Sequence, residues 1–527
     1  MFIDDLAELH FENHFTDELP ADPQRMNLTR PVERAAFSWV EPRSVAAPAL
    51  LTHSSEVAGL LGLSEAAVSS PRFLAMVSGN EVLPGMQPFA MAYGGHQFGN
   101  WAGQLGDGRA INLGEVRDAG GDSWTLQLKG AGPTPFSRSA DGLAVLRSSV
   151  REFLCSEAMF HLGVPTTRAL SLATTGEDVM RDMFYDGNAQ LEPGAVVCRV
   201  ARSFVRFGSF ELPTSRGDHA LLKQLADHTI RHHFASLVPD SGEIDADVYA
   251  SWFAEVARRT ADLMVHWGRV GFVHGVMNTD NMSILGDTID YGPYGWLEDY
   301  DPDWTPNTTD AHGRRYAFAK QSQIGLWNLV RLAHAIHPLI GSSEPLQAVV
   351  DDYGKNYSAG WHAMMAAKLG LDGGWREADL ELVQDLLGLL AAHETDMTLF
   401  FRELSCAAPD RALHAFEAAW HGDAEGSPAA SSDHRLACSA WMQRYFERAA
   451  QDRAAAMNQV NPRFVLRNWL AQNVIKAAEA GDFAKLHELQ DTLRRPYEEQ
   501  PGREHLATRR PAWARNEPGC SMLSCSS

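Results

Sequence analysis

The hydrophobic pattern of the chain changes from short strand-like runs in its first half to helical periodicity in its second. Two apolar runs, Ala110–Val116 and Trp124–Lys129, are joined by a turn rich in Gly and Asp and predict a hairpin. In residues 143–162 the apolar positions recur at steps of three and four, which predicts an amphipathic helix. Two further apolar runs predict strands at Ala169–Ala173 and Ala195–Val200.

Helical periodicity dominates the chain from about residue 217 onward. A stretch rich in Gly, Asn and Asp, Gly271–Pro293, interrupts it and contains two short strand candidates, Met282–Leu285 and Thr288–Asp290. Residues 421–433 have the composition of a surface loop. The predicted helices cover residues 217–236, 247–268, 317–337, 344–369, 376–404, 434–456, 463–479 and 483–494.

This order of elements predicts an α+β fold with two lobes, because a strand-rich region with one helix precedes a long helical region. The outline is typical of a protein kinase-like bilobal fold. We expect an N-terminal extension that packs on the core (1–84), a strand-rich N-lobe (85–215), a large helical C-lobe (216–500) with its catalytic loop at 274–293, and a flexible tail rich in Arg and Pro (501–527).

The acidic balance of the 527-residue chain limits its partners. Its formal net charge is −22, and a field of that sign repels phosphate backbones, so nucleic acid is not expected as a partner. No run of about 18 apolar residues predicts a membrane span. Residues 1–15 are acidic and lack the basic start and apolar stretch of a secretory signal, so we expect a cytoplasmic protein.

Six cysteines are too few for a disulfide scaffold in a chain of this length. Cys520 and Cys525 stand apart, because both lie close to the C-terminal end. The other four lie in apolar or helical segments and are predicted to be buried, inert thiols, namely Cys155, Cys198, Cys406 and Cys438.

The segment Gly103–Arg109 has features of a phosphate-binding loop. Phosphoryl and nucleotidyl transfer need backbone donors around phosphates, a cation, metal ligands and a group that orients the acceptor. Glycines let backbone amides approach phosphate oxygens closely, and Arg109 adds a charged fork. A Gly-rich turn without this role would have the same pattern, so the segment alone does not decide the function.

Further charged residues follow in an order that suits a nucleotide site. Lys129 ends a predicted strand, and Glu152 lies in the middle of the next predicted helix. Arg199 and Arg206 follow a later strand, and an acidic protein that handles three phosphates needs such cations. Each of these residues could instead be a solvated or ion-paired surface charge.

The most informative segment is the loop at 274–293. Kinase-like enzymes place an asparagine five residues after a catalytic aspartate, followed by an Asp-Phe-Gly-type turn. Asn281 fits the asparagine and Asp290 begins the turn, but Val276 occupies the position of the aspartate. Asn and Asp offer hard oxygen ligands, which suits Mg²⁺ or Mn²⁺ on nucleotide phosphates. Asp280 is the carboxylate left in the loop to act as a base.

Several long stretches make the chain resemble the SelO/YdiU family. Two of them are PFAMAYGGHQFGNWAGQLGDGRAINLGE at 88–115 and GFVHGVMNTDNMSILGDTIDYGP at 271–293, and the others lie at 126–159, 198–211 and 461–472. The likeness extends over nearly the whole chain. It implies a kinase-like fold that binds ATP in a flipped orientation and transfers AMP to Ser, Thr or Tyr side chains of other proteins.

The resemblance also implies roles for individual residues. Asp280 matches the proton acceptor, and Asn281 with Asp290 matches the ligands of Mg²⁺ or Mn²⁺. Glu152 matches the helix partner of the strand lysine. The positions that match the nucleotide-binding residues, besides Asp290, are Gly106, Gly108, Arg109, Lys129, Asp141, Gly142, Arg199 and Arg206.

A flipped nucleotide would explain why Val276 occupies the position of the kinase aspartate. The α-phosphorus would face the acceptor hydroxyl and pyrophosphate would leave, so a base at position 276 would have no proton to take. Lys129, Arg199 and Arg206 would then hold the terminal phosphates. The alternatives are transfer of UMP from UTP with Mn²⁺, phosphorylation by an ordinary kinase, and a non-catalytic ATP-binding scaffold.

Members of the family often end in selenocysteine or cysteine followed by two small residues, and some relatives are thought to use that residue in redox control. Here the chain ends Cys525-Ser526-Ser527. Residues 271–320 contain no cysteine that could bridge to the terminus. The remaining pairing would be Cys520 with Cys525.

Overall fold

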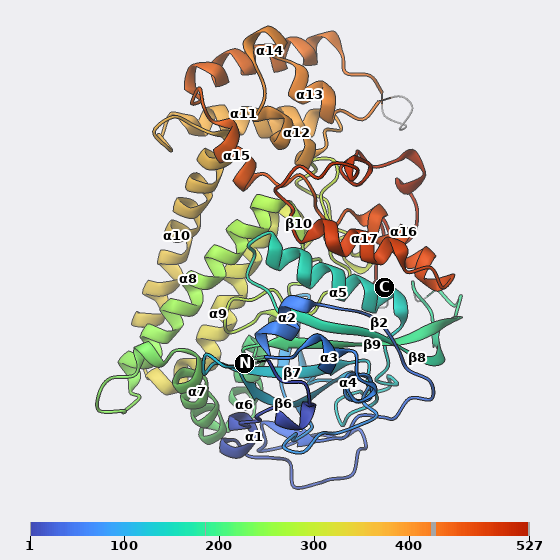
Figure 1. Cartoon of the computed structure of the whole chain (residues 1–527). Helices are drawn as coiled ribbons and strands as arrows, with labels where there is room; N and C mark the ends of the chain where they lie inside the picture. The colour runs from blue at the N-terminus through green and yellow to red at the C-terminus, as the bar shows by residue number, and fades with distance from the viewer. Residues whose placement is uncertain (1, 185, 423–427, 525–527) are drawn as a thin grey trace.

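A seven-stranded antiparallel sheet forms the centre of the first half of the chain (Figure 1). The computed structural model describes residues 2–184, 186–422 and 428–524. The strand order is β1-β3-β6-β7-β9-β8-β2, with every neighbouring pair antiparallel. The strands are β1 (Phe37–Trp39), β2 (Ala49–His53), β3 (Phe89–Met91), β6 (Ala110–Arg117), β7 (Ser123–Lys129), β8 (Arg168–Arg181) and β9 (Gln190–Ala201).

Four predicted strands are confirmed as β6, β7, β8 and β9, although β8 and β9 extend well beyond the predicted runs into a long hairpin. The predicted hairpin is the β6–β7 pair, in which Ala110 is opposite Lys129. Two short strand candidates, Met282–Leu285 and Thr288–Asp290, are wrong. Each segment forms one isolated bridge instead. Ser283 pairs with Arg206, and Thr288 pairs with Thr166, so each segment contacts a separate part of the chain at a single residue.

Helices cover both faces of the sheet. The helix predicted at residues 143–162 is α5 (Leu146–His161). Its apolar residues pack in one cluster with those of β8 and β9. Its other side is covered by α16 (Asn468–Glu479) and α17 (Ala484–Leu493), so even its polar residues are buried. The opposite face packs on the N-terminal helices α2 (Ser55–Leu60), α3 (Glu65–Val68) and α4 (Pro71–Ser78).

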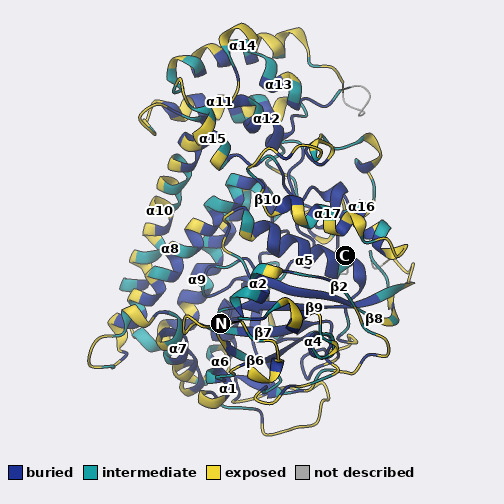
Figure 2. Ribbon diagram, viewed as in Figure 1, coloured by how far each residue is buried: buried dark blue, intermediate teal, exposed yellow. Residues whose placement is uncertain are grey.

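The second half is helical, and the mixture of helices with an antiparallel sheet agrees with the predicted α+β class. Two predicted helices are each split in two, and α6 and α13 were missed. The helices are α6 (Phe207–Ser215), α7 (His219–His233), α8 (Ala246–Val270), α9 (Gln321–Ile340), α10 (Glu344–Leu369), α11 (Asp379–Ala392), α12 (Met397–Leu404), α13 (His414–Ala419), α14 (Ser432–Arg448) and α15 (Ala454–Val460). Buried residues concentrate in the sheet, α5 and α6, whereas α14 is largely exposed (Figure 2). None of the helices in the described ranges has the length and apolar character needed to cross a membrane.

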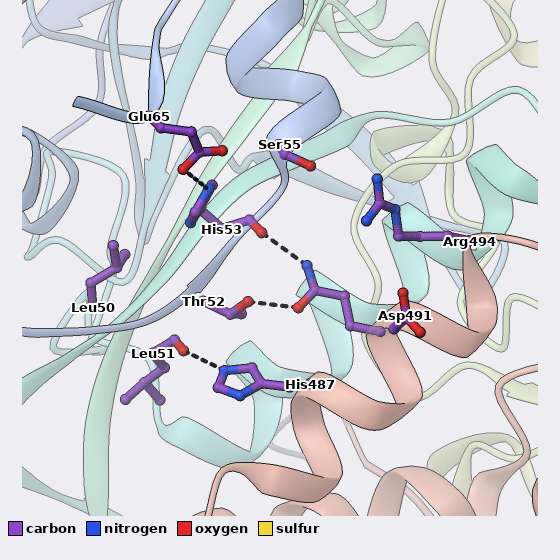
Figure 3. A pocket seen from close by; sticks show the side chains of 10 residues that line it. Leu50, Leu51, Thr52, His53, Ser55, Glu65, His487, Asp491 and Arg494 are labelled. Atoms are coloured by element: carbon purple, nitrogen blue, oxygen red, sulfur yellow. Dashed lines mark hydrogen bonds and ion pairs between the residues drawn. The ribbon is translucent and has the colours of Figure 1, made fainter. Parts of the chain in front are cut away.

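The free edge of β2 is covered by α17 (Figure 3). The Leu51 carbonyl oxygen lies 3.0 Å from Nε2 of His487, and the His53 carbonyl accepts from the Gln490 amide at 2.9 Å. Thr52 donates to the same glutamine at 2.6 Å. These contacts satisfy polar groups that an edge strand would otherwise present to solvent. A cavity of about 450 Å³ lies beside them.

The C-terminal segment, predicted to be a flexible tail, packs on the helical half over residues 501–524. Leu523 is fully buried and forms a parallel bridge with Asn307. Its carbonyl oxygen accepts from the Thr308 amide at 2.8 Å. Asn307 in turn donates its side-chain amide to the Gly275 oxygen at 3.0 Å. The segment is thus connected through one residue to the loop at 274–293.

The cysteines differ in environment. Cys406 is exposed, so its predicted burial is wrong, because it lies in the turn just after α12. Cys520 is buried, and burial raises the pKa of its thiol to about 12. Cys525 lies outside the described residues. The other three cysteines predicted to be buried are so, namely Cys155, Cys198 and Cys438.

Candidate functional site

A cavity of about 730 Å³ lies between the sheet and the loop at 274–293. The segment from Leu105 to Ala110 lines one part of it, and residues 136–143 with the β8–β9 hairpin line another. Arg206 and Glu152 do not line the cavity, but both contact residues that do. The predicted site residues on its wall are Gly106, Gly108, Arg109, Lys129, Asp141, Gly142, Arg199, Asp280, Asn281 and Asp290.

Two glycines on the wall have backbones that exclude larger residues. Gly106 has a φ of 85°, and a Cβ there would lie 2.3 Å from Cγ of Phe136. Gly142 has a φ of 73°, and a Cβ there would lie 2.2 Å from the carbonyl oxygen of Gly132. Because the Gly132 contact is with backbone, it cannot be relieved by rotating a side chain. The close packing shapes the wall of the cavity.

We expect Gly142→Ala to lower both stability and nucleotide binding. The positive φ alone costs about 1–2 kcal/mol in a non-glycine residue, and the clash with the Gly132 carbonyl adds to it. Gly217→Ala is the matched control, because Gly217 has a φ of 70° but nothing within 4 Å of its missing Cβ. Chemical denaturation and ATP titration of both variants measure the difference. Equal losses in the two variants would show that packing at Gly142 contributes nothing.

Lys129 and Glu152 form a buried ion pair between β7 and α5. Glu152 is 2% exposed, and its second oxygen accepts from Nη1 of Arg199 at 2.9 Å. Arg199 also donates to Gln127 on β7. Burial lowers the pKa of Lys129 to about 8, although Glu152 opposes the shift. One carboxylate therefore holds two cations at the edge of the cavity.

Asp290 is held by two arginines. Its Oδ1 accepts from Arg199 at 2.6 Å and its Oδ2 accepts from Arg206. Burial would raise the pKa of Asp290, but Arg206, Arg199 and Lys129 outweigh it and hold that pKa well below its usual range. Arg206 is fully buried, and its Cζ lies 4.4 Å from the ring centroid of Tyr93. It also donates to the backbone oxygen of Asp280 at 2.8 Å. The backbone φ of Asp290 is 56°, which few non-glycine residues adopt.

Asp280 lies in the same loop, where Gln97 donates to its Oδ2 at 3.1 Å. Its Oδ1 is buried and has no hydrogen-bond partner among the described residues. Burial raises the pKa of Asp280 to about 7. Gly95 leaves room for this carboxylate, because a Cβ there would lie 2.9 Å from Oδ1. One buried carboxylate oxygen of Asp280 is therefore left without a hydrogen-bond partner among the described residues.

Asn281 and Val276 contact each other within the loop. The Asn281 side-chain amide donates to the Val276 carbonyl at 2.9 Å, which leaves its oxygen as the atom that could bind a cation. Val276 is 6% exposed and lines the cavity at the position where a kinase has its aspartate. Asn281 and Asp290 are both on the wall, and a carboxylate can accept more bonds than the two arginine contacts of Asp290. This oxygen donor set fits a hard divalent cation.

Asp141 and Arg109 complete the predicted set. Asp141 forms a two-pronged pair with Arg181 at 2.7 and 2.8 Å. Burial would raise the pKa of Asp141, but the Arg181 contact outweighs it and lowers that pKa. Arg109 lines the cavity and makes no ion pair with any residue in the described ranges. Arg109 is therefore a cation available to an anionic ligand.

Sequence reasoning missed several residues of the cavity. Gln97, Tyr93 and Asp107 lie in the Gly-rich stretch that was singled out, but their roles depend on distant partners. Asp107 is buried and accepts from the Met91 amide at 3.0 Å. Arg181 lies in the part of β8 that extends beyond the predicted strand. The position of Gln97, Tyr93 and Asp107 beside glycines does not by itself reveal these contacts.

Comparison with known proteins identifies the family of the chain. A family model described as protein adenylyltransferase SelO matches residues 28–494. The chain is 56% identical over 545 residues to the protein nucleotidyltransferase YdiU of Rhodopirellula baltica, with 99% of both chains covered. It is 57% identical over 531 residues to the protein of that name from Azoarcus sp., which it covers completely, and 55% identical to that of Xanthomonas campestris. The chain therefore belongs to the SelO/YdiU family of protein nucleotidyltransferases.

Proposed function

We propose that this protein transfers AMP from ATP to Ser, Thr or Tyr hydroxyls of other proteins and releases pyrophosphate. The observation that carries the proposal is a pair of side chains on the cavity wall. Val276 is apolar where a kinase needs its base, and Asp280 has an oxygen without a partner in the described part of the chain. In this proposal Asp280 accepts the proton of the attacking hydroxyl, whose oxygen then bonds to the α-phosphorus while the bond to pyrophosphate breaks.

The cations around the cavity would bind the triphosphate. Lys129, Arg199 and Arg109 line the wall and would hold the terminal phosphates, so that pyrophosphate leaves toward them. Arg206 does not line the cavity, and because it contacts Asp290 and the Asp280 backbone it would position both residues. Glu152 would orient Lys129 and Arg199 by accepting from both.

Asn281 and Asp290 would hold the divalent cation, Mg²⁺ or Mn²⁺. When bound, such a cation neutralises phosphate charge as it develops during transfer. Arg199 and Arg206 keep the Asp290 carboxylate ionised and fixed toward the cavity. We further propose that the sheet with α5 and the helices from α6 onward correspond to the two lobes of a kinase-like fold.

The direction of transfer is tested with labelled ATP. We expect label at the α-phosphorus to enter protein and label at the γ-phosphorus not to enter, because pyrophosphate is the leaving group. Parallel reactions with ATP and UTP, each with Mg²⁺ or Mn²⁺, determine which nucleotide is used. Incorporation of γ-label that is lost in Lys129→Ala would favour phosphorylation and overturn the proposal.

A further inference from the structure

A cluster of imidazoles and a carboxylate lies outside the nucleotide cavity, where the N-terminal helix α1 (His14–Glu18) meets α7. We propose that His14, Glu18 and His232 form a binding site for one Zn²⁺ ion. None of the three lines the cavity of the candidate functional site. Two imidazoles and a carboxylate are a ligand set that Zn²⁺ uses in proteins with a water molecule in the fourth position.

The geometry of the cluster suits one ion. His14 and Glu18 are one turn apart on α1, and the ligand atoms of the three residues all lie within 4.8 Å of one another. Nε2 of His232 lies 2.9 Å from Oε1 of Glu18, and Nδ1 of His14 lies 3.8 Å from the same oxygen. Ligand atoms around tetrahedral Zn²⁺ are separated by roughly 3.4 Å, from bond lengths near 2.1 Å. Small side-chain shifts would therefore complete the site.

Neighbouring residues hold the ligands in place. Nδ1 of His228, which is 4% exposed, lies 2.8 Å from Oε2 of Glu18. Nε2 of His14 lies 3.5 Å from a carboxylate oxygen of Glu12. The rings of His14 and His232 stack with centroids 4.5 Å apart. Glu18 and His14, two of the three ligands, thus each have an outer contact, and such contacts are typical of metal sites.

The same cluster is poorly explained by ion pairs alone. His228 and His232 lie within hydrogen-bond distance of Glu18, and His14 is a third imidazole beside the same carboxylate without such a contact. The 3.8 Å separation of His14 from Glu18 is too long for a hydrogen bond. The side chains of Glu18 and His14 are 42% and 39% exposed, so an ion could enter from solvent. A bound ion would fasten the N-terminal segment to α7.

Calorimetric titration of Zn²⁺ into the full-length, chelator-treated protein tests the proposal. Excess Mg²⁺ is present throughout to occupy the nucleotide site. We expect one Zn²⁺ ion per chain in the wild type and in Asp290→Asn. His14→Gln and His232→Gln should each weaken that binding by more than about 100-fold, because each removes a direct ligand. His219→Gln is the matched control, an exposed histidine at the start of the same helix α7.

Visible absorption of the Co²⁺-loaded protein and thermal melting give independent readouts. Tetrahedral Co²⁺ bands should appear in the wild type and in His219→Gln and be absent in His14→Gln. Zn²⁺ should raise the melting temperature of the wild type but not of His14→Gln, whose metal-free melting temperature reports whether the variant folds. Zn²⁺ binding that survives in both ligand variants, or that is lost only in Asp290→Asn, would overturn the proposal.

Discussion

Asp290→Ala should abolish nucleotide transfer at saturating Mg²⁺ and Mn²⁺. The change removes the anionic member of the proposed cation site, and metal contacts contribute several kcal/mol of transition-state stabilisation. A loss of roughly 10³-fold or more is therefore expected, at about 1.4 kcal/mol for each factor of ten. Transfer of label from α-labelled ATP to protein measures the effect.

The surroundings of Asp290 predict a second effect. Arg199 and Arg206 are both buried and share this carboxylate, so its removal leaves charged donors without their partner. We expect the unfolding free energy to fall by about 1–3 kcal/mol. Asp290→Asn keeps an oxygen for one arginine and should recover more stability than activity, because the amide lacks the charge that binds the cation.

A matched control separates lost stability from lost chemistry. Asp396 and Arg467 form another fully buried pair, in the helical half and away from the cavity, with Nη1 and Oδ2 2.6 Å apart. Asp396→Asn should destabilise the protein at least as much as Asp290→Asn and leave transfer by the folded protein unchanged. Full activity of Asp290→Ala, or equal losses of activity in the two Asn variants, would contradict the cation-binding role.

Asp280→Asn should lower transfer by roughly 10²–10⁴-fold, the usual effect of losing a general base. The substitution preserves the shape of the side chain and an oxygen that can accept from Gln97. ATP affinity, measured by calorimetry, should change far less than the rate, because the cations that would bind the triphosphate are different residues. A parallel loss of ATP binding and activity would instead make Asp280 a nucleotide or metal ligand.

Val276→Asp is the complementary variant. It restores the kinase residue at the position five before Asn281, yet phosphorylation should not appear if the γ-phosphate points away from the acceptor. The side chain is buried at 6% exposure, so a thermal melt is needed to show that the variant folds. Phosphorylation of protein by folded Val276→Asp would remove the basis of the flipped-nucleotide proposal.

The sequence predicted those parts of the fold that depend on local periodicity. The regular apolar stripe of α5 and the apolar runs of β6 and β7 are visible in single segments. Helix α6 was missed because it contains Pro213 and is buried along most of its length, so it lacks an amphipathic stripe. The predicted helix at 376–404 divides because Asp396 caps a new helix, with its carboxylate accepting from the Leu399 amide at 2.9 Å.

The candidate site was predictable where its residues follow a known order along the chain. Lys129, Glu152, Asn281 and Asp290 follow such an order, and the structure brings them to one cavity or into contact with it. Gln97 could not be recognised, because its partner Asp280 is 183 residues away and a single glutamine carries no pattern. The ion pairs of Arg199 and Arg206 with Asp290 could not be predicted either, because they depend on the packing of β9 against the loop.

The docking of Leu523 beside Thr308 has a consequence for how an active enzyme arises in the cell. The two residues are 215 positions apart, and Asn307, next to Thr308, contacts Gly275 in the loop that carries Asp280 and Asn281. At roughly 5–20 residues per second, a ribosome needs about 10–40 s to synthesise the intervening chain. During that interval the nascent polypeptide has its nucleotide-binding residues but lacks the contact of Leu523 with the segment that supports the loop, so catalysis would begin only after residue 523 has been synthesised.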